Sequence, residues 1–444
     1  MDILRTARER GLMLVRFLWC GNDGTIRAKA TALGGLEARL NSGIGVTLAM
    51  EAMNSLDRLQ SVEGMGPVGE LRIVPDPTTF RVLPYAPRTG AVLTDQVGLD
   101  GNPAPVCQRS FLKRMEAALD ARGALLRAGF ENEFTLARLE EGKWRPVDSS
   151  LCFSTIGMTV SQEYVDALLE ALEEQGIAVD QYYAELGPGQ QELTTGHAPA
   201  LLAADTQILT RETIRGVAAS RGLAASLAPK PWPDAAGNGC HIHVSLWDRD
   251  SGRNRFYAPE APLSDEGRAF TAGLLAHLPG LCGLTVPSFN SYRRISTQTW
   301  SGAYTCWGYD NREAPLRVPS VFRGMEEAST NVELKAADTT CNPYLALGGI
   351  IAAGLDGMER GLELPEAIDV DPATLSDRER EERGIVRLPR TQSEALDALE
   401  SDGVLGGALG ETLLRSYLAV RRSEWEAYSA EDEEFEHQGH FLKY

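Results

Sequence analysis

Two glutamates separated by a single residue stand in the apolar stretch Phe130-Glu131-Asn132-Glu133-Phe134. Side chains two positions apart on a β-strand point to the same face, so this spacing would place two carboxylates side by side. Two like charges that close are unfavourable unless a cation compensates them. The pair is therefore a candidate cation site, although a solvated edge strand with chance acids would give the same pattern.

Two further carboxylates flank a Gly-Pro-Gly turn in the segment 182–192. Glu185 precedes the turn and Glu192 follows it. A turn of this composition can fold the two acids toward one another. A surface loop that is merely polar is the alternative interpretation.

Histidines alternate in the predicted strand 237–246, where His241 and His243 would face the same way. A His-x-His pair alone is a weak metal signal, because a hydrogen-bonded structural histidine is more common. Farther along, Glu333 and Lys335 would share one face of another strand. Five glutamates and one histidine on short strands and turns favour hard cations such as Mg²⁺ or Mn²⁺. Two such ions side by side would suit phosphoryl transfer.

Arginines supply a positive counterpart in a later region that contains Arg293, Arg294, Arg312 and Arg317 among apolar residues. Guanidinium groups contact carboxylate and phosphate in bidentate geometry. Each arginine alone could be a surface ion-pair partner, but the cluster favours an anion site. The chain has no P-loop motif and no strand-placed G-x-G-x-x-G, so any ATP site would be built differently.

The elements that must position these residues are predicted to form at least two domains, since 444 residues exceed what one core usually supports. Residues 1–103 are predicted to form a small α+β unit that ends in a turn-rich boundary. Residues 104–444 are predicted to alternate strands and helices and to carry the chemistry. The predicted strands are 15–19, 71–75 and 81–84, and the predicted helices are 107–121 and a buried helix at 344–355. An acidic helical tail is predicted from about residue 411, either as a solvated face or as a contact with another subunit.

The composition of the chain limits the molecules that it is expected to bind and the compartment in which it is expected to work. The formal net charge is −19, which argues against nucleic acid because phosphate binding needs clustered Lys and Arg. Seven scattered cysteines without a C-x-x-C pair are typical of a reduced, intracellular protein. The chain shows neither a signal-peptide core nor an apolar run long enough to span a bilayer. We therefore expect a cytoplasmic protein with no membrane partner.

Six motifs occur in an order that resembles glutamine synthetases of the bacterial and archaeal class. They are E-N-E-F, E-L-G-P-G-Q-Q-E, A-P-K-P leading into G-N-G-C-H-I-H-V-S-L, N-S-Y-R-R, D-N-R-E-A-P-L-R-V-P and N-P-Y-L-A-L. Each motif alone is modest, but six in order are highly specific. The match runs from about residue 105 to the end. The N-terminal part resembles the family's small β-grasp domain more loosely, mainly through D-G-T-I-R-A-K.

The resemblance implies an α+β fold in which a β-grasp-like domain, residues 1–103, precedes an ATP- and metal-binding catalytic domain, residues 104–444, built on an antiparallel sheet with helices. It also implies a homo-oligomer of hexameric rings, commonly stacked as a dodecamer, with active sites shared between neighbouring subunits. In the implied reaction, ATP phosphorylates the γ-carboxylate of glutamate and an amine displaces the phosphate. The implied cofactors are two or more Mg²⁺ or Mn²⁺ ions per site.

Roles for individual residues follow from the same resemblance. One metal ion would be held by Glu131, His241 and Glu333, and the other by Glu133, Glu185 and Glu192. Because all six positions carry competent ligands, the chain resembles a working enzyme. A relative that has lost catalysis and serves as a regulatory or structural ring is the alternative.

The resemblance also assigns the substrates and the catalytic arginines. His243 and Arg294 would meet the amino-acid substrate beside Gly237. Arg312 and Arg317, together with Arg294, would form the catalytic cationic set, in which the first two stabilise the transferring phosphoryl group.

Two departures from the family fall on the amine side. The family's N-terminal Asp-Gly-Ser-Ser, whose Asp helps to deprotonate ammonium, corresponds to residues 45–50, which read G-V-T-L-A-M. The flap glutamate that contacts ammonium aligns with Trp300. Loss of both acids removes the cage for a small cation, while an indole offers a face for an apolar or cationic organic amine. We therefore expect an amine larger than ammonia, as in relatives that make γ-glutamyl-polyamines. A Trp300 that only packs the flap, with ammonia retained as substrate, is the alternative.

Two more departures fall on the acid side. A substrate-binding Asn of the family aligns with Ala236, and the two arginines of its R-x-E-x-R pattern align with Asn331 and Lys335. At the substrate carboxylate, the ammonium group of Lys335 would replace an arginine guanidinium, which can form two parallel hydrogen bonds. An acid other than glutamate is therefore an open alternative.

Overall fold

The first hundred residues of the computed structural model, which describes residues 3–444, form a six-stranded mixed sheet with two helices. Its elements are α1 (Ile3–Glu9), β1 (Leu14–Cys20), β2 (Ile26–Ala32), α2 (Leu33–Ser42), β3 (Ile44–Thr47), η1 (Leu48–Ala52), β4 (Glu70–Pro75), η2 (Pro77–Thr79), β5 (Arg81–Val82) and β6 (Thr89–Val97). The strand order is β2-β1-β6-β4-β3, with β5 beside β6 and only β1 and β6 parallel. The three strands predicted here are confirmed, the last of them shorter than expected.

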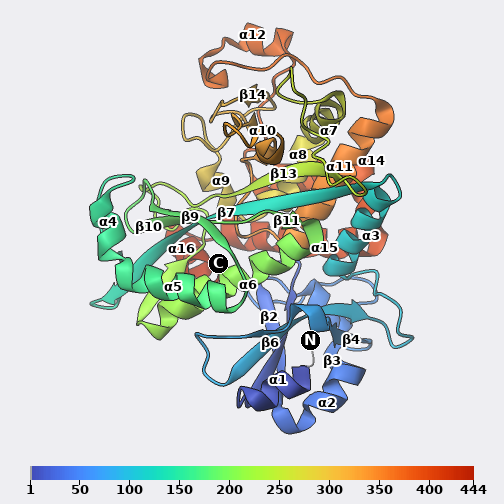
Figure 1. Ribbon diagram of the computed structural model, residues 1–444, viewed down its shortest axis with the longest axis vertical. Coiled ribbons are helices and arrows are strands. Elements are labelled where there is room, and N and C mark those ends of the chain that lie inside the picture. The colour runs from blue at the N-terminus through green and yellow to red at the C-terminus, as the bar shows by residue number, and fades with distance from the viewer. Residues whose placement is uncertain (1–2) are drawn as a thin grey trace.

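A ten-stranded sheet organises the remainder of the chain and lies above the small sheet in Figure 1. Its strands are β7 (Ala124–Glu140), β8 (Lys143–Pro146), β9 (Val179–Ala184), β10 (Gln190–Thr195), β11 (Ala198–Pro199), β12 (Leu223–Ser226), β13 (Cys240–Asp248), β14 (Trp307–Tyr309), β15 (Leu316–Val318) and β16 (Val332–Leu334). The main order is β14-β15-β16-β13-β7-β10-β9, antiparallel except between β14 and β15. The predicted α+β class with an antiparallel catalytic sheet is confirmed.

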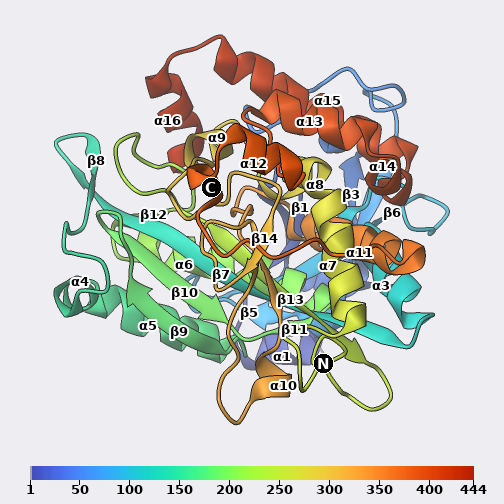
Figure 2. The same cartoon turned by 90° about the horizontal axis from the view of Figure 1, so that it is seen from above.

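Helices cover this sheet and the C-terminal ones group along one side of the molecule (Figure 2). They are α3 (Gln108–Asp120), α4 (Thr155–Val160), α5 (Gln162–Glu174), α6 (Ala200–Ser220), α7 (Asp265–Ala276), α8 (Leu278–Thr285), α9 (Ser291–Arg294), α10 (Glu326–Ser329), α11 (Pro343–Arg360), η3 (Pro372–Thr374), α12 (Asp377–Glu382), α13 (Gln392–Ser401), α14 (Gly403–Leu409), α15 (Glu411–Ser429) and α16 (Glu433–Phe441). Within residues 3–444 none of these helices combines the length and the apolar content needed to cross a bilayer.

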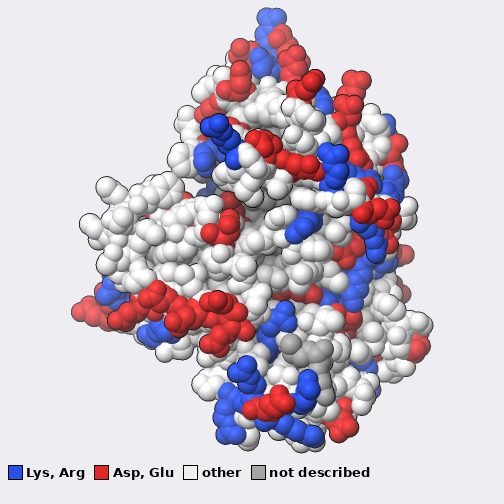
Figure 3. Space-filling view, viewed as in Figure 1, with Lys and Arg blue, Asp and Glu red and all other residues white. Residues whose placement is uncertain are grey.

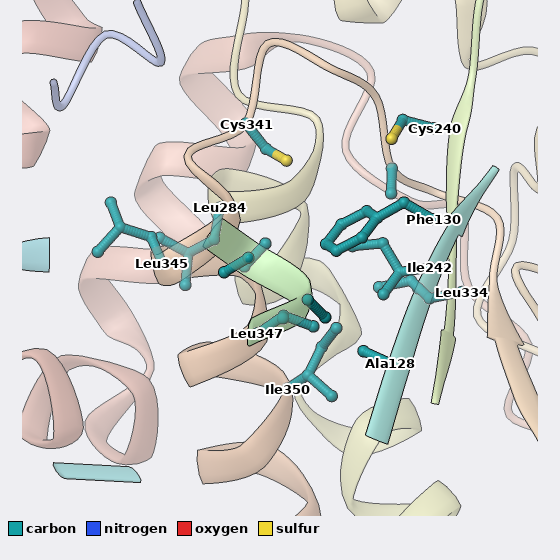
Figure 4. Packing of buried hydrophobic residues seen from close by; sticks show 14 of the residues in the cluster. Ala128, Phe130, Cys240, Ile242, Leu284, Leu334, Cys341, Leu345, Leu347 and Ile350 are labelled. Carbon is teal, nitrogen blue, oxygen red and sulfur yellow. The ribbon is translucent and has the colours of Figure 1, made fainter. Parts of the chain in front are cut away.

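Strand alternation gives the large sheet one apolar and one polar face at its centre. Phe130 on β7, Ile242 on β13 and Leu334 on β16 are buried and face α11 (Figure 4). Burial of each such side chain contributes roughly 1.5–3 kcal/mol to stability. The neighbouring residues in sequence must then point to the opposite face. The apolar packing therefore fixes where the adjacent polar side chains point.

The predicted buried helix is confirmed by α11, whose residues from Pro343 to Leu355 are buried. Asn342 caps this helix, because its side chain accepts a hydrogen bond from the Tyr344 N–H at 3.0 Å. The cap fixes the point at which the chain turns from the active-site strand β16 into the core.

The acidic tail differs in part from the prediction of a solvated or subunit-contacting surface. Arg421 on α15 is fully buried and pairs with Glu424 at 3.0 Å. The Tyr444 hydroxyl donates to the carbonyl of Asp23 at 2.6 Å, and the Leu227 N–H donates to the carbonyl of Tyr444 at 2.7 Å. The inner side of the tail therefore joins the two sheets, and only its outer side is exposed.

Candidate active site

The polar face of the large sheet gathers acidic and imidazole side chains from four neighbouring strands. Register places Glu131 opposite His241, Glu333 opposite His243, and Glu133 opposite Glu192. Opposite residues of antiparallel strands share a face. Residues separated in sequence by up to two hundred positions thus meet because the strands β10, β7, β13 and β16 lie side by side.

The first cluster consists of Glu131, His243 and Glu333, whose ligand atoms all lie within 4.8 Å of one another. His243 Nε2 is 3.0 Å from Glu131 Oε1, and its Nδ1 is 2.8 Å from the side-chain oxygen of Asn331. His241 also reaches this cluster, with Nδ1 3.1 Å from Glu131 Oε2 and 3.4 Å from Glu333 Oε1. The structure therefore brings the predicted ligands Glu131, His241 and Glu333 together, with His243 beside them.

Electrostatic coupling keeps this first cluster ionised. Burial alone would lower the pKa of His243, but the charge of Glu131 outweighs it and raises that pKa to about 9. Burial alone would raise the pKa of Glu131, yet the neighbouring His243 and His241 hold it well below its usual range. The pKa of Glu333 is lowered to about 2, because Lys335 and the two histidines outweigh burial. Ionised carboxylates in this setting are suitable ligands for a divalent cation.

The second cluster is the predicted set Glu133, Glu185 and Glu192. Glu133 and Glu192 lie opposite one another on paired strands, whereas within residues 3–444 only the first cluster has three ligand atoms that all lie within 4.8 Å of one another. Gln190 Nε2 and the Gly239 N–H each donate to Glu133 Oε2 at 2.9 Å. The Tyr183 hydroxyl donates to Glu192. These contacts orient the carboxylates toward the polar face of the sheet.

Like charges in this second cluster oppose one another. Burial, and then the charge of Glu133, raise the pKa of Glu192 to about 9. Burial and the same charge raise the pKa of Glu185. Burying several carboxylates close together costs free energy, because their negative charges repel one another. Such an arrangement is typical of a site in which a bound cation balances the charge. The oxygen-rich donor set fits Mg²⁺ or Mn²⁺.

Cationic side chains border the two clusters. Arg317 Nη1 is 2.9 Å from Glu333 Oε2, and Lys335 Nζ is 3.2 Å from Glu333 Oε1. Arg294 Nη2 is 3.2 Å from His241 Nε2. Arg312 is exposed, and its charge acts on Glu185. The predicted arginines therefore surround the acidic clusters, whereas Lys335 is buried against a predicted metal ligand.

A glycine that sequence analysis did not single out creates the space between these groups. A Cβ at Gly239 would lie 2.5 Å from Arg294 Nη2, 2.8 Å from His241 Nε2 and 3.0 Å from Glu133 Oε1. At the predicted Gly237, a Cβ would lie 2.4 Å from the carbonyl of Pro229. The alternation Gly-Asn-Gly in the sequence was the available signal, because close backbone approach requires glycine.

The loop that carries Trp300 forms the rim of the site and is conformationally strained. Trp300 is 57% exposed, with a φ of 56°, and Gln298 has a φ of 59°. Positive φ is uncommon outside glycine and marks strain that the surroundings must hold. The Trp300 N–H donates to Glu313 Oε1 at 2.9 Å. Glu313 is a rim residue that sequence analysis did not identify.

Comparisons with known proteins agree with this geometry. Residues 105–440 match the family "Glutamine synthetase, catalytic domain". Residues 1–104 match the family "Glutamine synthetase N-terminal domain". A gamma-glutamylpolyamine synthetase of Streptomyces coelicolor is 34% identical, covering 94% of this chain and 90% of that protein. A glutamine synthetase of Mycolicibacterium smegmatis is 32% identical, covering 96% and 95%.

A solved structure described as a novel glutamine synthase homolog superposes with a TM-score of 0.86 at 33% identity, covering 96% of this chain and 97% of that chain. Members of this family use ATP and divalent metal ions to join glutamate to ammonia or an amine. The chain belongs to the glutamine synthetase family and is an ATP-dependent carbon–nitrogen ligase.

Proposed function

We propose that this ligase activates the γ-carboxylate of glutamate, or of a close analogue, and couples it to an organic amine larger than ammonia. The observation that carries the proposal is the indole of Trp300, exposed on the rim at the position where the family has an ammonium-binding glutamate. An aromatic face attracts alkyl chains and organic cations. The similarity to a gamma-glutamylpolyamine synthetase supports the same direction.

The two acidic clusters would divide the metal sites between them. Glu131 and Glu333, with His241 and His243 beside them, would hold the ion nearer the ATP phosphates. The second cluster of Glu133, Glu185 and Glu192 would hold the other ion. Such ions, Mg²⁺ or Mn²⁺, neutralise polyphosphate charge and orient the transferring group.

The remaining predicted residues would handle the acid and the phosphoryl group. Arg312 and Arg317 would stabilise the charge on the transferring phosphoryl group. Arg294 and His243 would orient the amino acid next to Gly237. Lys335 would act mainly by balancing Glu333, which it contacts, and less by gripping a substrate carboxylate.

Chemically, a carboxylate is a poor acyl donor, and phosphorylation supplies a leaving group. The γ-carboxylate oxygen attacks the terminal phosphorus of ATP and releases ADP. The free-base nitrogen of the amine then attacks the γ-carbonyl carbon, the C–O bond to phosphate breaks, and the nitrogen loses a proton. The products are an amide, ADP and inorganic phosphate.

We also infer a homo-oligomer of hexameric rings, with a dodecamer as its stacked form, because the family builds its sites between subunits. Mass photometry of the purified protein tests this arrangement. Masses of six or twelve chains are expected, and a monomer would contradict the inference.

Glutamine synthetase activity with ammonia is the second candidate, favoured by relatives of that name at 32% identity. An inactive ring is disfavoured by the complete ligand set. The test is ADP release with glutamate, ATP and Mg²⁺ across ammonium, monoamines and diamines, with product masses determined. An organic amine is expected to be the best nucleophile. Ammonium as the best nucleophile would contradict the proposal, and no turnover with any amine would indicate the inactive ring.

A further inference from the structure

The rim contains a carboxylate next to Trp300, the residue that aligns with the family's flap glutamate. Glu313 lies in the loop between β14 and β15, directly after Arg312. Its Oε1 accepts the hydrogen bond from the Trp300 N–H at 2.9 Å. An acid from a neighbouring loop thus reaches the backbone of Trp300, the residue that aligns with the family's flap glutamate.

The surroundings of Glu313 place it at the edge of the active site. Its side chain is half-buried, and the charges of Lys335 and Asp371 act on it. Lys335 contacts the metal-cluster residue Glu333 at 3.2 Å. Asp371 lies on the outer side, where it accepts a hydrogen bond from Gln298 of the flap at 3.4 Å. Glu313 therefore stands between the acidic clusters and the exposed rim.

A competing carboxylate in the N-terminal part of this chain is already engaged. Glu51 directly follows the segment 45–50 that lacks the family's Asp. It is 1% exposed and accepts hydrogen bonds from Gln96 at 2.7 Å and from Gln108 at 2.8 Å. Glu51 is thus closed off inside its own chain and does not replace the missing acid.

We propose that Glu313 and Trp300 together form a specificity site for an amine that carries a second positive charge, such as an α,ω-diamine. This inference rests on the proposed function. The attacking nitrogen must be a free base, so only a second nitrogen keeps its charge during the reaction. Glu313 contacts the backbone of Trp300, whose indole is exposed. A carboxylate so placed would form an ion pair with an ammonium group on an alkyl chain, and the indole would add a cation–π contact.

The test compares two substrates of equal chain length, 1,4-diaminobutane and n-butylamine, with the full-length protein. In the E313Q variant, the ratio of kcat/KM for the diamine to that for the monoamine is expected to fall roughly 10- to 100-fold, as for loss of a charged hydrogen-bond partner. The E313D variant should give an intermediate ratio. The exposed Glu381 on α12 provides the matched control, since E381Q removes one carboxylate without changing the ratio.

A role in holding the flap alone would lower kcat/KM for both amines equally, and an unchanged ratio in E313Q would overturn the inference. Activity with n-butylamine also shows that each variant is folded. A wild-type protein that turns over only ammonium contradicts the proposed function as well. A wild-type protein that accepts both amines, with a ratio that E313Q does not change, contradicts only the role of Glu313.

Discussion

The floor and the rim of the active site differ in how their side chains are held. On the floor, Glu131, His241 and Glu333 stand on paired strands whose opposite faces are packed against α11 (Figure 4). On the rim, Trp300 and Glu313 stand on loops, and the flap backbone adopts positive φ values. Strand register fixes the floor, whereas a few loop contacts fix the rim.

This difference shows where chemistry and specificity can change independently. Substitution on the floor would disturb both the ligand geometry and the packing beneath it. Substitution on the rim leaves that packing in place, and loops tolerate change more readily. The floor carries every residue predicted to bind metal, while the departures are divided: Trp300 lies at the rim, whereas Asn331 and Lys335 contact the floor residues His243 and Glu333.

The distribution of charged residues over the surface does not follow this division between floor and rim. Asp and Glu gather in a band over the region of α5 on the face drawn in Figure 3, with Lys and Arg interspersed elsewhere on that face. Net charge of this kind affects solubility and association. The acidic groups proposed to take part in the reaction lie instead on the large sheet.

The largest effect is expected on the floor, from Glu333→Gln. The substitution keeps the shape of the side chain but leaves Arg317 and Lys335 without the carboxylate that they contact at 2.9 and 3.2 Å. Loss of a metal-binding charge should lower kcat by about 10³-fold or more with every amine, since the metal stabilises several kcal/mol of transition-state charge. The exposed Glu381 on α12, changed to Gln, is again the matched control. Retention of near-normal kcat would show that Glu333 is not a ligand.

A smaller loss of activity is expected from Arg312→Lys, which keeps the positive charge but removes the guanidinium group that can form two parallel hydrogen bonds. We expect kcat to fall roughly 10²-fold with a modest change in KM, because removal of one transition-state donor typically costs this much. Steady-state kinetics with saturating ATP measures it. Arg293 contacts Glu436 at 2.9 Å, so R293K should be near wild type. An equal loss in both variants would argue against a specific role for Arg312.

At the rim, Trp300→Glu should move the preference toward ammonium about tenfold, because it exchanges a cation–π contact for an acid at the flap. Trp300→Phe, which keeps an aromatic face, should change the preference much less. Relative kcat/KM values for ammonium and butylamine test both variants. If the two variants behave alike, the indole only packs the flap and ammonia is the better interpretation of the site.

The smallest effect concerns pH in the metal-free protein. The pKa of Glu192 is raised from 4.5 to about 9. Between these values the folded state holds a proton that the unfolded chain has released, so this group makes stability fall as pH rises. A bound divalent ion displaces that proton, and its affinity should increase with pH over the same window.

Thermal melts with and without Mg²⁺ measure this linkage. The gain in Tm on adding Mg²⁺ should be a few degrees larger at pH 8.5 than at pH 6.5. In Glu192→Gln the difference between the two pH values should shrink. A gain that is larger at the lower pH would contradict the assignment of Glu192 to the metal-binding cluster.

Much of the fold and of the floor was predictable from sequence, because alternation on strands is a local property. The pairing of Glu131 with Glu133, and of His241 with His243, on one face each followed from spacing alone. Which strands lie side by side is not a local property, and here the order of motifs supplied it through the family resemblance.

What sequence missed are contacts that depend on the folding of loops and of the tail. Glu313 stood inside a recognised motif, next to Arg312, yet its partner is thirteen residues earlier across the rim. The spacing of Glu333 and Lys335 predicted a shared face, but not the burial that holds their charged groups 3.2 Å apart. The tail was predicted to be a solvated face or a subunit contact, and its inner side instead contacts this chain, where Tyr444 donates to the carbonyl of Asp23.

A competition reaction measures the preference of the enzyme for an organic amine over ammonia directly. Equal concentrations of ammonium and 1,4-diaminobutane, supplied together with glutamate, ATP and Mg²⁺, form products in the ratio of their kcat/KM values. Mass spectrometry of the products gives that ratio in one measurement. A large excess of the γ-glutamyl diamine is expected, whereas a product that is mainly glutamine would contradict the proposed preference for an organic amine.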